Sequence, residues 1–195
     1  MTNHNNHKSQ KSVGKNKNTW ISFLFDQTYI TKMNTINMTL FSNTSINLMN
    51  KTGIHMTCIF IGRLLAGKQV TQLQEANYII QQYLEKLVNL GITLEFDRFD
   101  YFPPNSNKKK LLVALYKPNK QLKKWNLDFR IALSKLGMCS YIDDSFLAHI
   151  TMGKIKKSLG DNELPNLETL EQYPDLKLTG LVLHGQPNKY IQIGN

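Results

Sequence analysis

Two histidines of this chain are each followed, two positions later, by a threonine, and this pattern is the one best suited to chemistry. The first copy is His55-Met56-Thr57-Cys58 and the second is His149-Ile150-Thr151-Met152. Each copy lies in a short apolar run with β-branched or aromatic residues, which predicts a strand. Because side chains alternate between the faces of a strand, each histidine shares a face with its threonine.

The same alternation predicts an apolar face behind each pair. On the first strand it consists of Ile54, Met56, Cys58 and Phe60. On the second strand it consists of Phe146, Ala148, Ile150 and Met152. A single His-x-Thr in a strand is more often a structural pair than a catalytic one. Two copies in equivalent places favour a catalytic interpretation.

A histidine pair can take and give a proton in one step, because the imidazole pKa is about 6.5. In phosphodiester cleavage, one histidine removes a proton from the attacking hydroxyl or water while the other protonates the departing oxygen. Thr57 and Thr151 can donate hydrogen bonds to the non-bridging phosphate oxygens. This chemistry uses no metal, and the clustered ligands of a zinc site are not recognisable. No nucleotide-cofactor or serine-hydrolase motif occurs, so we expect no cofactor.

The remaining pattern predicts the elements that position these residues. Strands are expected at 20–25, 92–99, 111–116, 176–183 and 189–193, and the stretch 27–50 is ambiguous and partly helical. One amphipathic helix is expected from the capping-box pattern Thr71 to Gln74 up to Gly91. A second runs from Pro118-Asn119 to Gly137, and a short one is expected at 166–172.

The order strand, helix, strand occurs at 54–99 and again at 146–183, each time after another apolar strand. This repetition predicts an α+β fold of two pseudo-symmetric lobes of antiparallel sheet, with helices outside and a central cleft where the two histidines face each other. We expect one domain over 19–195 after a disordered basic tail over 1–18, whose lysines are Lys8, Lys11, Lys15 and Lys17.

The composition indicates which kind of binding partner and which cellular location to expect. The chain of 195 residues has a net charge of +10, or +6 without the four tail lysines, which favours an RNA or oligonucleotide partner or serves solubility alone. Lys108 to Lys110 form either a solvated loop or an electrostatic funnel. With two cysteines, no bilayer-spanning run and no signal segment, we expect a monomer in the cytoplasm or nucleus that does not bind membranes. Cys58 is expected in the core, whereas His4, His7 and His184 receive no role.

Two His-x-[Ser/Thr] motifs about ninety residues apart resemble the two-histidine (2H) phosphoesterase superfamily. The flanking residues, Ile59-Phe60-Ile61-Gly62 after the first motif and Gly153-Lys154 after the second, are similar to those of the family. The resemblance covers about residues 20–193. Two positions depart from many relatives, which have proline where this chain has Ala148 and arginine where it has Lys154, and lysine lacks the bidentate fork of arginine.

The resemblance implies metal-independent cleavage of RNA-type phosphodiesters by His55 and His149, with Thr57 and Thr151 binding phosphate. Family substrates include 2′,3′-cyclic phosphate ends, 2′,5′-linked oligoadenylates, ADP-ribose cyclic phosphate and RNA 3′ tails. Further candidates for substrate binding are Lys154 and three aromatic residues that either stack a base or pack in the core: Tyr101, Phe102 and Tyr190. The alternative is a catalytically inactive RNA-end-binding module of the same fold.

Overall fold

The computed structural model describes residues 18–41, 46–49, 54–63, 69–103, 111–138, 146–155, 167, 173–184 and 191–193. The N-terminal tail, Lys108 to Lys110, Tyr190 and all but one residue of the helix expected at 166–172 lie outside these ranges. The predictions made for them therefore stay predictions.

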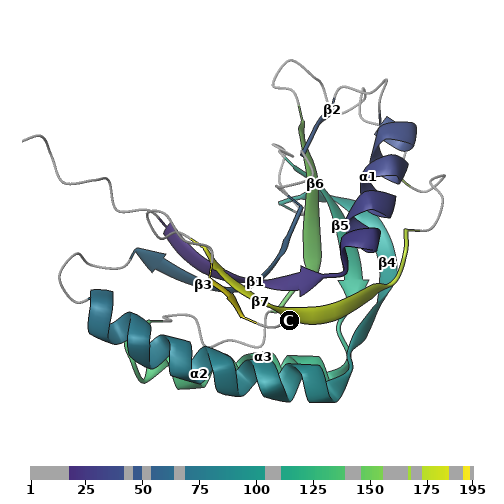
Figure 1. Ribbon diagram of the computed structural model, residues 1–195. Coiled ribbons are helices and arrows are strands. Elements are labelled where there is room, and N and C mark those ends of the chain that lie inside the picture. Colours follow the sequence, from purple (N-terminus) through teal and green to yellow (C-terminus); the bar gives the residue numbers. More distant parts are fainter. Residues whose placement is uncertain are drawn as a thin grey trace, which may run out of the picture.

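The described strands form one eight-stranded antiparallel sheet, whose two halves meet at an angle and form the two lobes (Figure 1). The first lobe contains β3 (Met56–Arg63), β1 (Asn18–Phe25), β7 (Leu176–His184) and β8 (Ile191–Ile193). The second contains β2 (Ile46–Leu48), β6 (His149–Ile155), β5 (Leu111–Lys117) and β4 (Thr93–Phe102). Helices α2 (Gln69–Leu90) and α3 (Lys120–Ser134) lie beneath the first lobe, and α1 (Gln27–Phe41) lies beside the second. The predicted α+β architecture of two lobes with outer helices is confirmed.

The lobes exchange strands, which the sequence repeat did not reveal. Strand β4 follows α2 in the first half of the chain, yet it pairs with β5 of the second half. Strand β7 belongs to the second half, yet it pairs with β1 of the first half. Each half therefore contributes two strands to each lobe: the first half supplies β1 and β3 to the first lobe and β2 and β4 to the second, and the second half supplies β5 and β6 to the second lobe and β7 and β8 to the first.

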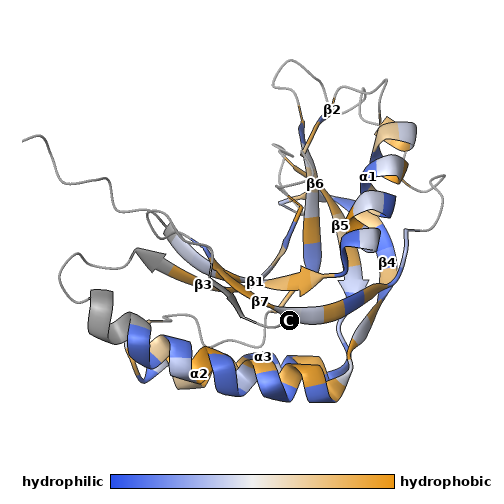
Figure 2. Ribbon diagram, in the orientation of Figure 1, coloured by the Kyte–Doolittle hydropathy of each residue, from blue (hydrophilic) through white to orange (hydrophobic). Residues whose placement is uncertain are grey.

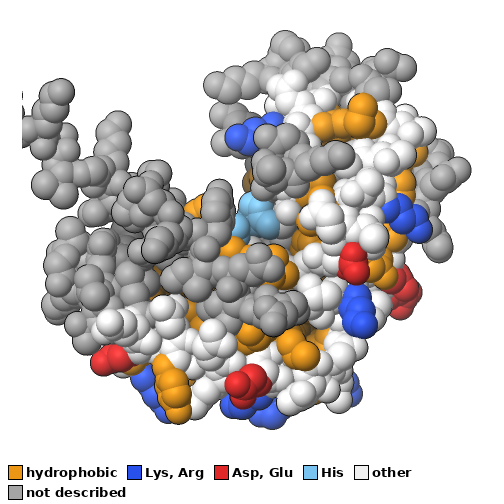
Figure 3. Space-filling view, in the orientation of Figure 1, with side chains coloured by type: hydrophobic (Ala, Val, Ile, Leu, Met, Phe, Trp, Pro, Cys, Tyr) orange, Lys and Arg blue, Asp and Glu red, His pale blue; other side chains and the backbone are white. Residues whose placement is uncertain are grey.

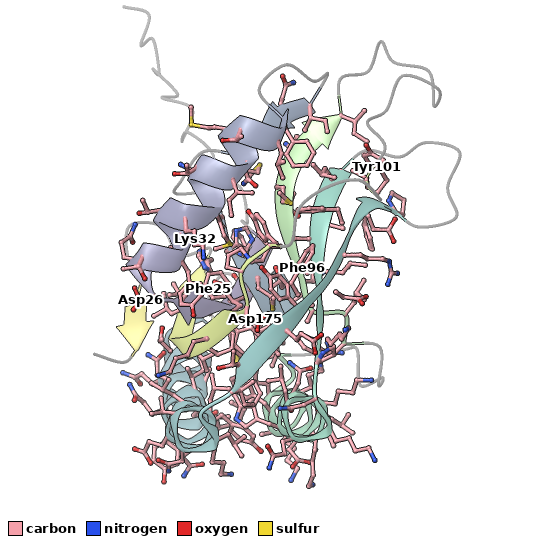
Figure 4. All side chains as sticks on the ribbon, turned by 90° about the vertical axis from the view of Figure 1, so that its right-hand side faces the viewer. Phe25, Asp26, Lys32, Phe96, Tyr101 and Asp175 are labelled. Carbon is pink, nitrogen blue, oxygen red and sulfur yellow. The ribbon has the colours of Figure 1, made fainter. Side chains whose placement is uncertain are left out.

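Two short pairings join the two halves of the sheet. Strand β3 meets β6 through the single opposed pair Met56 and Ile150. At the other junction β4 pairs with β7 near Leu94 and Leu176. Here the Phe96 amide donates a hydrogen bond of 3.0 Å to the Asp175 carboxylate, and the two residues lie close together in Figure 4.

Helix α1 resolves the ambiguous stretch 27–50. The Asp26 carboxylate accepts hydrogen bonds from the amide and the hydroxyl of Thr28, at 2.8 and 2.7 Å, which is a helix N-cap arrangement. These hydrogen bonds from Thr28 lower the pKa of Asp26. The helix buries Met33 and Phe41. The Phe41 ring makes an edge-to-face contact with Phe99 on β4, with ring centroids 5.9 Å apart.

Helices α2 and α3 form one layer under the first lobe, and hydropathy alternates along both of them in Figure 2. Asn119 caps α3 as predicted by accepting a hydrogen bond of 2.8 Å from the Leu122 amide. The capping box expected at Thr71 is wrong, because α2 begins at Gln69 and Thr71 is already inside the helix. The Trp125 indole donates to the Tyr83 carbonyl at 2.9 Å and ties the two helices together.

A β-bulge interrupts each histidine-bearing strand at the equivalent place. In the first lobe Ser22 opposes Thr57 and Ile21 opposes Ile59, so Cys58 is the extra residue. In the second lobe Val113 opposes Thr151 and Leu112 opposes Gly153, so Met152 is the extra residue. Both extra residues stay in the core.

The bulge overturns one prediction about the first strand. Ile54, Met56 and Cys58 are buried as the alternation predicts, but Phe60 is 49 % exposed. Phe60 opposes Trp20 in the same pairing in which Thr57 opposes Ser22. Because the extra residue shifts the alternation by one position, Phe60 lies on the face of His55 and Thr57. All four residues of the apolar face predicted for the second strand are buried.

Asn126 of α3 supports the first bulge. Its side-chain amide donates a hydrogen bond of 3.0 Å to the Cys58 carbonyl, and Asn126 is 1 % exposed. Burial is the main cause that raises the pKa of the Cys58 thiol, which keeps it protonated. Cys58 is therefore a core residue, as predicted, and its carbonyl anchors α3 to the strand.

The substitution Asn126→Ala tests this support. It leaves the Cys58 carbonyl buried without its partner, so we expect the free energy of unfolding to fall by about 1 to 3 kcal/mol in urea titrations. Asn89→Ala at an exposed position of α2 is the matched control, and it should change stability by less than about 0.5 kcal/mol. Equal losses in the two variants would contradict the role of Asn126.

Candidate functional site

The pair that joins the lobes also assembles the site. Met56 and Ile150 oppose each other in an antiparallel register, and both are fully buried. In such a register the residue before one strand position faces the residue after the other, so His55 lies opposite Thr151 and His149 opposite Thr57. All four are half-buried. The structure thus brings the two predicted His-x-Thr motifs together, with each histidine beside the threonine of the other lobe.

The ring of His149 is fixed through one nitrogen. Its Nδ1 lies 2.9 Å from the Leu147 carbonyl oxygen, which can only accept, so Nδ1 carries the proton. Neutral His149 therefore presents an unprotonated Nε2, the form that acts as a general base. The ring also stacks on Phe102 of β4, with centroids 5.6 Å apart and planes inclined by 8°.

Two aromatic rings of the described residues adjoin the ring of His55. His184, the last residue of β7, lies 5.8 Å from it between ring centroids, and Trp20 of β1 lies at 6.1 Å. The indole of Trp20 stacks on His184 at 4.8 Å with the planes inclined by 5°. His184, to which the sequence pattern assigns no role, is therefore half-buried in ring contact with His55 and Trp20.

Long-range pairing explains why His184 was missed. Its sequence neighbourhood gives no motif, and its place depends on the pairing of β7 with β1, where His184 opposes Trp20. In this position Nε2 of His184 lies 2.6 Å from the hydroxyl of buried Ser22, from which it is separated by 162 residues. Burial, and secondarily the neighbouring His55, lowers the pKa of His184 to about 4. His184 is therefore a neutral imidazole at physiological pH.

Three further candidates for substrate binding have different surroundings. Lys154 is exposed on β6, where it opposes Leu111 of β5 and Asn47 of β2. Tyr101 is 7 % exposed and opposes Leu112 on the core side of β4, so its candidacy as a stacking residue is wrong; burial raises its pKa to about 12. Tyr190 lies outside the described residues.

The centre of the site lies in the hollow between the lobes, where Figure 3 shows histidine at the surface. On the second lobe this face also carries Asp100, which opposes Val113, and Arg98, which opposes Leu115. The two side chains form an ion pair at 3.5 Å. Within the described ranges no three His, Cys, Asp or Glu side chains form a group that could hold a metal ion. No described helix is long and apolar enough to cross a membrane.

This geometry is suited to proton transfer across a phosphate group. Two imidazoles on opposite lobes can act on opposite sides of one phosphorus atom, and two hydroxyls lie beside them. On the first lobe the rings of Trp20 and His184 adjoin His55, whereas on the second lobe the ring of Phe102 stacks on His149. The two histidines therefore have similar places but different neighbours.

The buried, neutral state of His184 predicts an acid-sensitive fold. Between its ordinary pKa of 6.5 and its pKa of about 4 in the folded protein, the unfolded chain binds a proton that the folded protein does not. Stability that is complete above pH 6.5 is consequently lost as the pH falls toward 4. His184→Gln removes this titration, so the unfolding free energy should decrease less in the variant than in the wild type between about pH 7 and about pH 5. Equal decreases would contradict the assignment.

Comparison with solved structures identifies proteins that share this fold. No protein-family model and no curated protein matches this sequence. Solved structures do match. The Thermus thermophilus protein TT0787 is 12 % identical, with a TM-score of 0.61 over 90 % of this chain and 93 % of that one. The Escherichia coli protein LigT complexed with 3′-AMP is 16 % identical, with a TM-score of 0.60 over 93 % of this chain and all of that one.

The PDE domain of MHV ns2 also matches, with 16 % identity and a TM-score of 0.57 over 91 % of this chain and 99 % of that one. These proteins share almost the whole length of this chain and have 2H phosphoesterase folds. The chain therefore has the two-lobed fold of the two-histidine phosphoesterases.

Proposed function

We propose that this chain is a metal-independent phosphodiesterase that cleaves RNA-type phosphodiesters, either 2′,5′-linked oligonucleotides or 2′,3′-cyclic phosphate ends, with His55 and His149 as the acid/base pair. The observation that carries the proposal is the register through Met56 and Ile150, which places a histidine and a threonine from each lobe around one point. The solved structures of LigT with 3′-AMP and with phosphate support a nucleotide ligand for this fold.

In the proposed reaction one histidine removes a proton from the attacking group and the other gives a proton to the departing oxygen. In a 2′,5′-linked oligonucleotide, one histidine accepts the proton of the neighbouring 3′-hydroxyl, whose oxygen attacks phosphorus. The bond from phosphorus to the departing 5′-oxygen breaks, and the other histidine protonates that oxygen. In a 2′,3′-cyclic phosphate, water is the attacking group and a ribose oxygen departs. Thr57 and Thr151 hydrogen-bond the non-bridging oxygens, on which negative charge builds up in the transition state.

Charge supports an anionic substrate. The chain carries +10, and Lys154 lies on β6, three residues beyond Thr151 on the strand that begins with His149. Lysine can approach a phosphate as a point charge, although it lacks the planar fork of arginine. His149 enters the reaction with Nε2 as its reactive atom, because its other nitrogen is held by the Leu147 carbonyl.

Removal of either histidine tests the acid/base assignment. We expect His55→Ala and His149→Ala each to lower kcat by about 10²-fold to 10⁴-fold on 2′,5′-triadenylate or adenosine 2′,3′-cyclic phosphate, assayed in EDTA. His7→Ala is the matched control and should keep full activity. Turnover that survives both substitutions would overturn the proposal, and substrate binding without any wild-type turnover would identify an inactive RNA-end-binding module.

The threonines are tested through their hydroxyls. Thr57→Val and Thr151→Val keep the side-chain volume but remove the donor, so kcat should fall by about 10²-fold while substrate affinity changes little. Thr57→Ser and Thr151→Ser keep the hydroxyl and should restore most of kcat. Thr39→Val on the exposed part of α1 is the control for a change of threonine alone. Valine variants as active as the serine variants would exclude the hydroxyls from the reaction.

A further inference from the structure

Equivalent rows of side chains flank the two histidines on the site face of each lobe. On the first lobe the register aligns Phe60 of β3, Trp20 of β1 and His184 of β7. On the second lobe it aligns Lys154 of β6, Leu111 of β5 and Phe102 of β4. The rows correspond position by position, because Phe60 and Lys154 each lie five residues after a site histidine and beyond an equivalent bulge. The first row consists entirely of rings, whereas the second begins with a cation and an aliphatic side chain.

The first row is exposed where an aromatic ring would normally be buried. Phe60 is 49 % exposed, because the bulge at Cys58 turns it away from the core. Bulges are common beside active sites, where they redirect a side chain. The bulge is itself stabilised by the hydrogen bond from Asn126, so the orientation of Phe60 is built into the fold.

Trp20 adds a polar atom to the row. Its indole Nε1 is buried and has no hydrogen-bond partner within the part of the chain that the structure describes. A buried donor without a partner is unfavourable and needs an explanation. A ligand that stacks on the row and carries an acceptor at its edge supplies one. The ring of Trp20 is only 6.1 Å from that of His55, so such a ligand would adjoin the site.

The row is also uncharged. His184 remains neutral because it is buried against Trp20, and its Nε2 is engaged with the Ser22 hydroxyl. Among the described residues that adjoin His184, Trp20 and Ser22 on β1 and Val182 on β7 carry no charge, and His55 is the only one that can gain one. A flat, neutral group with hydrogen-bonding edges matches this surface better than a phosphate does. A nucleobase has these properties.

We infer that Phe60, Trp20 and His184 form a nucleobase subsite on the His55 side of the cleft. The base of one nucleoside that flanks the scissile phosphate stacks on this row, while its ribose spans the distance to His55. The inference rests on the proposed function, and it gives the cleft a direction: base recognition on the first lobe and additional anionic contacts, through Lys154, on the second.

Intrinsic fluorescence provides a binding assay that does not depend on turnover. The chain has two tryptophans, and Trp125 is 4 % exposed in the α2–α3 layer, so Trp125→Phe leaves Trp20 as the only indole. Adenosine 3′-monophosphate should quench the emission of Trp20 saturably. Ribose 5-phosphate has no base, and it should bind about 5-fold to 100-fold more weakly. Equal affinity for the two ligands would overturn the inference.

The variant Phe60→Leu should bind adenosine 3′-monophosphate about 5-fold to 100-fold more weakly. Its matched control is Tyr78→Leu, which replaces another exposed aromatic ring, 67 % exposed on α2, and should leave the affinity unchanged. In cleavage assays that do not need Trp125→Phe, Phe60→Leu should raise KM for a base-bearing substrate and leave kcat nearly unchanged. Normal turnover with an unaltered KM would exclude the subsite but not the phosphodiesterase. Base-dependent quenching without turnover would exclude the phosphodiesterase but not the subsite.

Discussion

The opposed pair Met56 and Ile150 is the contact on which the site depends. Among the described residues it is the one position at which β3 and β6 pair, and both side chains are fully buried in the core that the lobes share. Side chains alternate with period two, so a slip of one residue in this register would turn one histidine from the cleft into the core. Burial of these two apolar side chains opposes such a slip. The alignment of four polar groups is thus enforced by apolar packing on the opposite face of the same strands.

The two lobes share a framework but differ in what they display. Both lobes contain an equivalent bulge, at Cys58 and at Met152, and each histidine has an aromatic neighbour from one of the exchanged strands, His184 of β7 or Phe102 of β4. These ring contacts have almost equal centroid distances, 5.8 and 5.6 Å. The symmetry places the catalytic groups on either side of one point, and the differing side chains between them give the cleft two unlike ends.

Local pattern was sufficient to predict much of this arrangement. Local pattern located the histidine strands, most of the core faces behind them and the N-cap of α3, because all of these depend on residues close together in sequence. Helix α1 also had a local signal, Asp26 as its N-cap, which the polar and methionine-rich stretch obscured. Two features had no such signal. The bulge that exposes Phe60 depends on the partner strand and on Asn126, and the place of His184 depends on a strand pairing between the two ends of the chain.

The exchange of β4 and β7 has a consequence for how the molecule assembles. When the first half of the chain has been synthesised, β1 and β3 are present but β7, which pairs with β1, is not. Strand β4 is likewise made before β5, with which it pairs. Contacts such as that between Ser22 and His184, 162 residues apart, make the topology one of high contact order, which slows folding. Until β7 emerges, the edge of β1 with which it pairs stays open to other chains. The surroundings of His55 are therefore completed only after β7 has been synthesised.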